Sequence, residues 1–297
     1  MMNSLAERVA TALSAPVEPA VAAFARRLGT QAGARAVLFY GSNLRTRSLD
    51  GVLDFYVLTE GPVESGIWPR VSYHEWRDGG HDLRAKVATM TLATFHAAAS
   101  GELLDTTIWA RFVQPSALIW HKDEDAGSDV RAAIASAAIT AARLAVALGP
   151  ERGTAADYWR ALFRATYAAE FRVEKAGREN SILEANPAHF AGLLPLALEA
   201  AGIGFAQSDE ELRPALPESE RRRLRRWWAS RRRLGKPYNL MRLVRASTTF
   251  EGAARYAAWK IERHTGVAVK LTPWRERHPV LAAPAVLWQV WRARRQR

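Results

Sequence analysis

The pattern of hydrophobic and polar positions changes character near residue 125. Before it, short apolar runs end at glycine or polar turns. This predicts strands over 36–40, 53–58, 85–92 and 116–120, after two helices over 3–13 and 17–29. After it, apolar residues recur at helical spacing. Helices are expected over 129–148, 154–176, 189–201, 219–233, 249–264 and 284–295, with a proline-containing loop over 207–219.

This change of pattern predicts an α+β fold in two parts. A small mixed-sheet domain would occupy residues 1–125 and an all-helical domain residues 126–297, with the acidic segment 121–128 as the boundary. Each part is long enough to bury a hydrophobic core. The proposed helix over 129–148 is rich in alanine and carries Arg143, which favours a buried or amphipathic helix over a membrane span.

Composition narrows the classes of protein that fit. The 297 residues are 48% hydrophobic and 24% charged, which is typical of a folded globular chain. There is no cysteine, which excludes disulfides, thiolate zinc sites and a cysteine nucleophile. The N-terminus lacks the basic start and apolar stretch of a secretory signal, so we expect a cytoplasmic protein.

The charge balance indicates a polyanionic partner. The formal net charge is +12, and eleven tryptophans suit either a membrane interface or stacking on bases. The arginine run over 221–233 fits a solvated helix face, an anionic-lipid contact or a phosphate-binding wall. The C-terminal helix is expected to lie on the inner face of the cell membrane. Its proposed membrane contacts are Trp288, Trp291, Arg292, Arg294 and Arg295.

The candidate chemistry lies where the first predicted strand ends. Tyr40, Gly41 and Ser42 form a turn whose glycine lets the backbone approach a triphosphate, while its amides and hydroxyl can bind phosphate oxygens. Asp54, near the start of the next strand, would hold a divalent metal that bridges the same phosphates. This arrangement favours a nucleotidyltransferase, with Asp50 as a second candidate ligand. The alternative is a turn serine and a solvated aspartate.

These segments resemble the mitochondrial-type phosphatidate cytidylyltransferases, a family also known as translocator assembly and maintenance proteins, with bacterial relatives. Tyr40-Gly41-Ser42 and Leu53-Asp54-Phe55 match its Tyr-Gly-Ser and apolar-Asp-Phe segments, and Lys86 matches its strand-opening lysine. Segments 109–115, 167–172 and 249–261 resemble further parts of the family in the same order. The chain departs from it at Asn43-Leu44, where the family shows Gly-Val-Phe.

The resemblance implies that CTP and phosphatidate react, with Mg²⁺ as cofactor, to give CDP-diacylglycerol and pyrophosphate. The expected partners are CTP, phosphatidate and an anionic membrane surface, with no stable nucleic-acid complex. The implied site consists of catalytic Asp54, Lys86 and Asp50, of which the two aspartates hold the metal, and of nucleotide-binding Tyr40, Gly41, Ser42 and Arg111.

Two other functions stay open. One is nucleotidyl transfer to a soluble acceptor, such as an antibiotic or a tRNA end. The other is a non-catalytic nucleic-acid-binding protein built on the same domain, although the basic clusters lack a recognition helix or RNA-binding signature. A further metal-binding carboxylate would be Asp82, Asp105 or Glu170.

Overall fold

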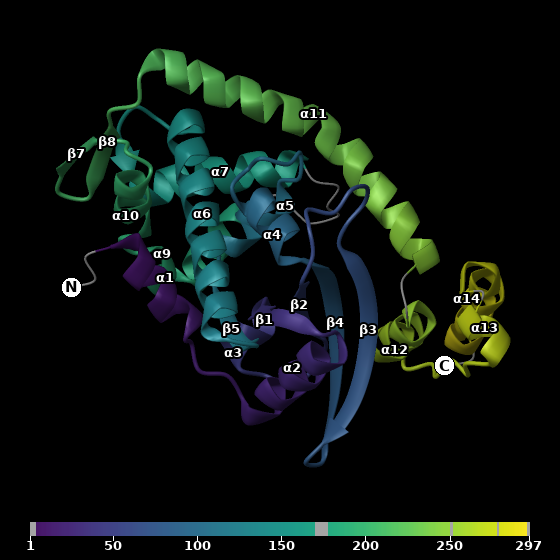
Figure 1. The fold of residues 1–297 in the computed structure, drawn as a ribbon. Coiled ribbons are helices and arrows are strands. Elements are labelled where there is room, and N and C mark those ends of the chain that lie inside the picture. The colour runs from purple at the N-terminus through teal and green to yellow at the C-terminus, as the bar shows by residue number, and fades with distance from the viewer. Residues whose placement is uncertain (1–3, 170–177, 250–251, 278, 296–297) are drawn as a thin grey trace.

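The computed structural model describes residues 4–169, 178–249, 252–277 and 279–295, arranged around a mixed five-stranded sheet (Figure 1). The strand order is β3-β4-β2-β1-β5, in which β2 and β4 are parallel and the other neighbours antiparallel. The strands are β1 (Ala34–Tyr40), β2 (Leu53–Thr59), β3 (Arg70–Asp78), β4 (His81–Thr91) and β5 (Ser116–His121). The four predicted strands are confirmed. β3 is an additional edge strand, whose hydrophobic signal is weak because only Tyr73 in it is fully buried.

The two faces of the sheet carry different layers because successive side chains alternate. Val37, Phe55 and Val87 face one small core, which α2 (Pro19–Gln31) covers. Leu38 and Tyr56 face the opposite, larger core. That core is covered by α1 (Leu5–Leu13), α4 (Leu92–Ala99), α5 (Thr107–Phe112) and α6 (Glu124–Leu148).

The central helix of the larger core is α6. It begins after Asp123, whose carboxylate accepts the backbone N–H of Ala126 at 2.8 Å. Within the described residues, α6 is the one helix long and apolar enough to cross a membrane, yet most of its apolar stretch is buried inside the protein. Its alanines let α7 (Ala155–Ala169) and α10 (Leu193–Ala200) pack against it. The expectation of a buried helix here is confirmed.

One hydrophobic core joins the two predicted parts of the chain. Leu38 and Tyr56 of the sheet belong to the same cluster as Val130 of α6 and Leu162 of α7. The fold is mixed α+β, as predicted. A division at residue 125 into a sheet domain and a helical domain is not confirmed, because α6 packs directly on β1 and β5.

The arginine run lies on α11 (Glu218–Thr249), a helix that continues well beyond its predicted end at 233. Arg221 and Arg225 donate hydrogen bonds to the carbonyls of Val146 and Ala147, at 2.9 and 2.8 Å. These carbonyls belong to the last turn of α6, where no helical partner exists. Arg231 is buried and donates to two carbonyls of the 101–103 loop. Part of the run is therefore structural rather than a solvated face or a lipid contact.

Further helices and strands complete the fold. They are α3 (Ser42–Thr46), α8 (Arg178–Ala185), α9 (Pro187–Phe190), β6 (Gly153–Thr154), β7 (Phe205–Ser208), β8 (Glu211–Pro214), α12 (Ala253–Thr265), α13 (Pro273–Arg277) and α14 (Pro279–Arg295). The predicted loop over 207–219 was wrong in part, since β7 and β8 form a hairpin that turns at Asp209 with a φ of 52°. α12 packs against β3 at the edge of the large sheet (Figure 1).

Candidate functional site

Three polar residues lie side by side across the sheet where its larger core ends. Tyr40 pairs with Asp54 in the β1–β2 ladder, and Asp54 pairs with Lys86 in the β2–β4 ladder. By alternation they share the face on which Leu38 and Tyr56 are buried. Tyr40, Asp54 and Lys86 therefore form a polar row at the end of the face that carries the larger core. The strand register brings the two predicted catalytic residues, Asp54 and Lys86, together.

Gly41 makes room for the Asp54 carboxylate. Its φ and ψ are 91° and −166°, a backbone conformation that residues other than glycine rarely adopt. A Cβ built on Gly41 would lie 3.1 Å from Oδ2 of Asp54. The buried side chain of Asn43 then donates to the carbonyls of Ser48 and Asp50, both at 2.9 Å, and holds the loop that returns to β2.

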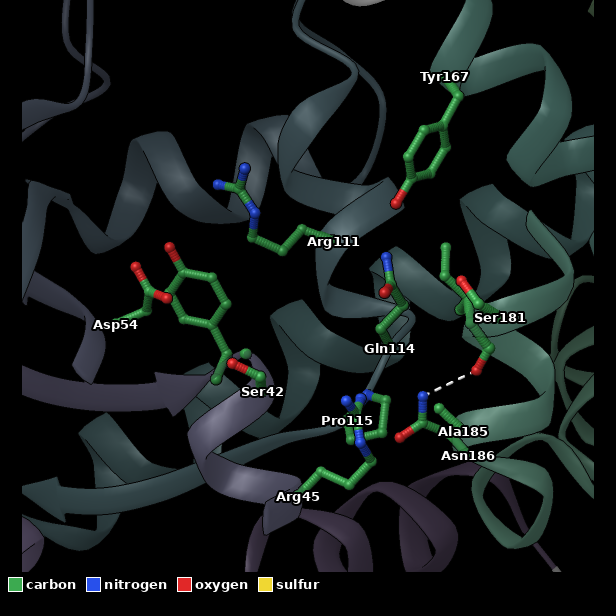
Figure 2. Close-up of a pocket in the computed structure, with 13 residues that line it drawn as sticks. Ser42, Arg45, Asp54, Arg111, Gln114, Pro115, Tyr167, Ser181, Ala185 and Asn186 are labelled. Atoms are coloured by element: carbon green, nitrogen blue, oxygen red, sulfur yellow. Dashed lines mark hydrogen bonds between the residues drawn. The ribbon is translucent and has the colours of Figure 1, made fainter. Parts of the chain in front are cut away.

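A cavity of about 460 Å³ opens beside this turn (Figure 2). That volume falls in the range typical of small-molecule sites. Five predicted site residues line it together, and the structure adds residues from α3, from the α5–β5 connection and from α7 and α8. The predicted ones are Tyr40, Gly41, Ser42, Asp54 and Arg111, and the added ones include Arg45, Gln114, Tyr167, Ser181 and Asn186.

Arg111 is held in place by aromatic side chains. Its guanidinium donates a 2.7 Å hydrogen bond to the hydroxyl of Tyr56 and lies 5.4 Å from the ring centre of Tyr40. The helix that carries it, α5, is capped by the buried carboxylate of Asp105, which accepts the backbone N–H groups of Thr107 and Ile108. The cation is thereby oriented before any ligand arrives.

The charges of the site shift one another's pKa values. Burial raises the pKa of Asp54, while Lys86 and then Arg111 act to lower it. Partial desolvation by the surrounding protein lowers the pKa of Lys86, although its side chain reaches solvent, and the negative charge of Asp54 opposes this shift. Burial raises the pKa of Tyr40 and Tyr56, so both phenols stay neutral and cannot act as bases near pH 7.

The donor set at Asp54 fits a magnesium ion that is shared with a phosphate ligand. In the part of the chain that the structure describes, no group of three or more His, Asp or Glu side chains could hold a metal by itself. Magnesium is commonly bound by one or two carboxylates together with substrate phosphates and water. Asp54 lies on the wall of the polar cavity, where such a ligand would meet it.

The other candidate carboxylates lie elsewhere. Asp50 sits in the exposed turn before β2 and does not line the cavity. Asp82 lies near the tip of the β3–β4 hairpin, 3.6 Å from Arg77. Asp105 is occupied by its capping bonds and by an ion pair with Arg242 of α11. Glu170 lies outside the described residues.

The proposed membrane contacts are on α14, which lies beside α12 and α13, beyond the β3 edge of the large sheet (Figure 1). Trp288 is 58% exposed, and the Arg292 guanidinium lies 5.4 Å from its ring centre. The side chains of Trp291, Arg294 and Arg295 lie outside the described part of the chain.

Several residues that line the cavity could not be predicted from local sequence patterns. Arg45 follows the predicted turn by three positions, but nothing local marks it as a ligand. Ser181 lies in α8 and Asn186 directly follows it, and α8 was not among the predicted helices. Only the packing of α8 brings these two residues to the cavity (Figure 2). Arg111 and Gln114 lie in segment 109–115, and the resemblance of this segment to a known family is the signal that indicates them.

Comparison with known proteins finds no model of a protein family that matches this chain, and no curated protein sequence that matches it.

Proposed function

We propose that this chain is a nucleotidyltransferase that transfers the cytidylyl group of CTP to phosphatidate, yielding CDP-diacylglycerol and pyrophosphate. The observation that carries the proposal is the meeting of the Gly41–Ser42 turn, the Asp54 carboxylate and the Arg111 guanidinium on the wall of one polar cavity. A triphosphate needs this combination of close backbone approach, cation and metal-binding carboxylate. The sequence resemblance supplies the choice of CTP and phosphatidate.

The proposed reaction requires no general base. A phosphate oxygen of phosphatidate attacks the α-phosphorus of CTP, and a new P–O bond forms. The bond from that phosphorus to the bridging oxygen of the leaving pyrophosphate breaks, and pyrophosphate takes the electron pair. Because the attacking oxygen is already anionic, no proton has to be removed.

The residues act by position and charge. Arg111, oriented by Tyr56 and Tyr40, would bind phosphate oxygens of CTP and offset the repulsion between the two polyanions. Lys86, on the other side of Asp54, would offset the same repulsion. Asp54 would hold magnesium with the phosphates, and the bound ion would supply further charge neutralisation.

A lipid acceptor fits the surface of the C-terminal helices. Trp274, Leu281 and Trp288 of α13 and α14 are exposed by 53, 69 and 58%. Exposed aromatic and aliphatic side chains beside arginine are the composition of a peripheral membrane contact. An enzyme whose acceptor stays in the bilayer needs such a contact, which would place the protein on the inner face of the cell membrane.

The test is transfer of label from CTP labelled at the α-phosphate to phosphatidate in vesicles, in the presence of Mg²⁺. Asp54→Asn is expected to lower the rate at least about 100-fold. Burial raises the pKa of Asp54, so the ionised form is disfavoured by folding and the neutral asparagine should not lower stability. Thermal unfolding of the variant checks this point.

Asp82→Asn is the matched control. It removes a carboxylate from the exposed end of β4, the strand beside that of Asp54, and should leave the rate unchanged. Equal rates for wild type and Asp54→Asn would refute the proposed site. Label found on a soluble acceptor, but never on phosphatidate, would keep the nucleotidyl transfer and refute the lipid acceptor.

A further inference from the structure

A second group of cations lies on the β4 side of Asp54, away from β1 and the Gly41 turn. Lys86 of β4 belongs to it, together with Lys260 and Arg263 of α12. The sheet order places β2 between β4 and β1, so Asp54 separates this group from the turn. Lys260 lies close enough to Lys86 for the two positive charges to act on each other.

Aromatic contacts fix α12 against the sheet at this point. The rings of Tyr256 and Tyr73 lie 5.4 Å apart, and Tyr73 is the ladder partner of Lys86. Trp259 has the guanidinium of Arg84 from β4 at 5.7 Å and that of Arg263 at 5.2 Å from its ring centre. α12 is therefore held where its cations reach the end of the polar row.

Arg263 also reaches the loop that leads into β2. A Cβ built on Gly51 would lie 3.1 Å from Nη1 of Arg263, so the guanidinium rests directly over this glycine. Gly51 has a φ of 93° and lies three positions before Asp54. One cation of α12 thus touches the segment that carries the metal-binding candidate.

These three cations outnumber their countercharges. Within the residues that the structure describes, no carboxylate lies within ion-pair distance of Lys86, Lys260 or Arg263. All three side chains are exposed to solvent. Like charges gathered on packed elements are unfavourable alone and favourable around an anion, and a dianionic phosphomonoester suits a group of three cations.

We propose that Lys86, Lys260 and Arg263 bind the phosphomonoester group of the acceptor. The inference rests on the proposed function and adds to it the site of the second substrate. CTP would enter from the β1 side of Asp54, where Arg45 and Arg111 line the cavity, and the acceptor phosphate would enter from the β4 side. The two polyanions would then meet at Asp54 from opposite directions, as in-line displacement requires.

The experiment measures binding separately from transfer. The full-length wild type, Lys260→Gln and Arg263→Gln are titrated with phosphatidylcholine vesicles containing phosphatidate, with vesicles containing phosphatidylserine instead, and with soluble glycerol 3-phosphate. CTP binding is measured in parallel. Each variant is expected to weaken phosphatidate binding about tenfold and to leave CTP binding unchanged, since one charged hydrogen-bond donor is lost.

Two further variants serve as controls. Lys270→Gln removes an exposed cation from the segment after α12 and should bind as wild type does. Lys260→Arg keeps the charge and should retain most of the affinity, which a loss of folding would not explain. Circular dichroism confirms that each variant is folded.

The outcomes separate the two proposals. Unchanged phosphatidate binding in both glutamine variants, or an equal loss for phosphatidylserine vesicles, would overturn the phosphomonoester site. If the glutamine variants lose as much affinity for glycerol 3-phosphate as for phosphatidate vesicles, the site is supported and a free phosphomonoester is a sufficient ligand. Loss of binding in the variants, when the wild type transfers no nucleotide, would overturn the proposed function and leave the binding site standing.

Discussion

Replacing Gly41 with alanine perturbs the backbone and the Asp54 carboxylate together. The residue has a φ of 91° and a ψ of −166°, and holding a residue with a side chain in this region costs about 1–3 kcal/mol of folding free energy. The added Cβ would meet Oδ2 of Asp54 at 3.1 Å, about 0.3 Å short of the 3.4 Å at which ordinary contact begins. The carboxylate must therefore move by a few tenths of an ångström.

That displacement sets the expected effect on activity. A misplacement of about 1 Å can lower an enzymatic rate about 100-fold, so about 0.3 Å is expected to lower kcat/KM at least about fourfold. Urea unfolding measures the change in stability, and cytidylyl transfer to phosphatidate measures the change in activity. Both should fall in Gly41→Ala.

Gly80→Ala isolates the contribution of the backbone. Gly80 has a φ of 86° in the turn between β3 and β4, and a Cβ there would have no atom within 4 Å. This variant should lose stability, by about 1–2 kcal/mol, without losing activity. If Gly41→Ala kept the wild-type kcat/KM, or if both variants lost activity equally, the claim that Gly41 makes space for a functional carboxylate would be wrong.

Three further outcomes are expected. Lys86→Gln removes a cation that lowers the pKa of Asp54, so the acid limb of the pH profile of kcat/KM should move to higher pH; a limb that stays in place would contradict the coupling. Glu220→Gln should lower the free energy of unfolding by about 0.5–1 kcal/mol at pH 7, because a hydrogen bond from Arg143 lowers the pKa of Glu220 in the folded state. That stabilisation exists above the ordinary pKa of 4.5 and is lost as the pH falls through the lowered value. In urea unfolding, the difference in free energy of unfolding between wild type and variant should therefore disappear in acid and persist at high pH. Trp288→Ala should weaken binding to phosphatidate vesicles about fivefold, since about 1 kcal/mol of apolar burial is lost, and flotation of both proteins alike would exclude this contact.

The C-terminal half shows which roles of charged residues a local pattern cannot predict. The arginine run of α11 was expected to face solvent, lipid or phosphate, since long runs of charge are usually exposed. Most of its arginines are exposed as expected. However, Arg221 and Arg225 also donate to the last carbonyls of α6, and Arg231 is buried against a loop. No local pattern predicts this, because the carbonyls belong to segments more than 70 residues earlier in the chain.

The metal-binding candidates show the same limit. Asp54, Asp82 and Asp105 are equivalent as residue types, and only their surroundings distinguish them. Asp105 is consumed by capping α5 and by Arg242, and Asp82 lies near a hairpin tip. Asp54 alone of these three lines the cavity, because strand register places it between Tyr40 and Lys86.

Local sequence patterns were sufficient for most of the elements and for the first half of the site. Hydrophobic runs that end at polar turns were sufficient to predict four of the strands, the turn at Gly41 and the position of Asp54, because these features depend on residues near one another in the chain. Only the tertiary structure brought Arg111 and the residues of α8 to one cavity, and the cations of α12 to the β4 side of Asp54. Their approach depends on how helices from distant parts of the chain pack around one core, and periodicity carries no information about that packing.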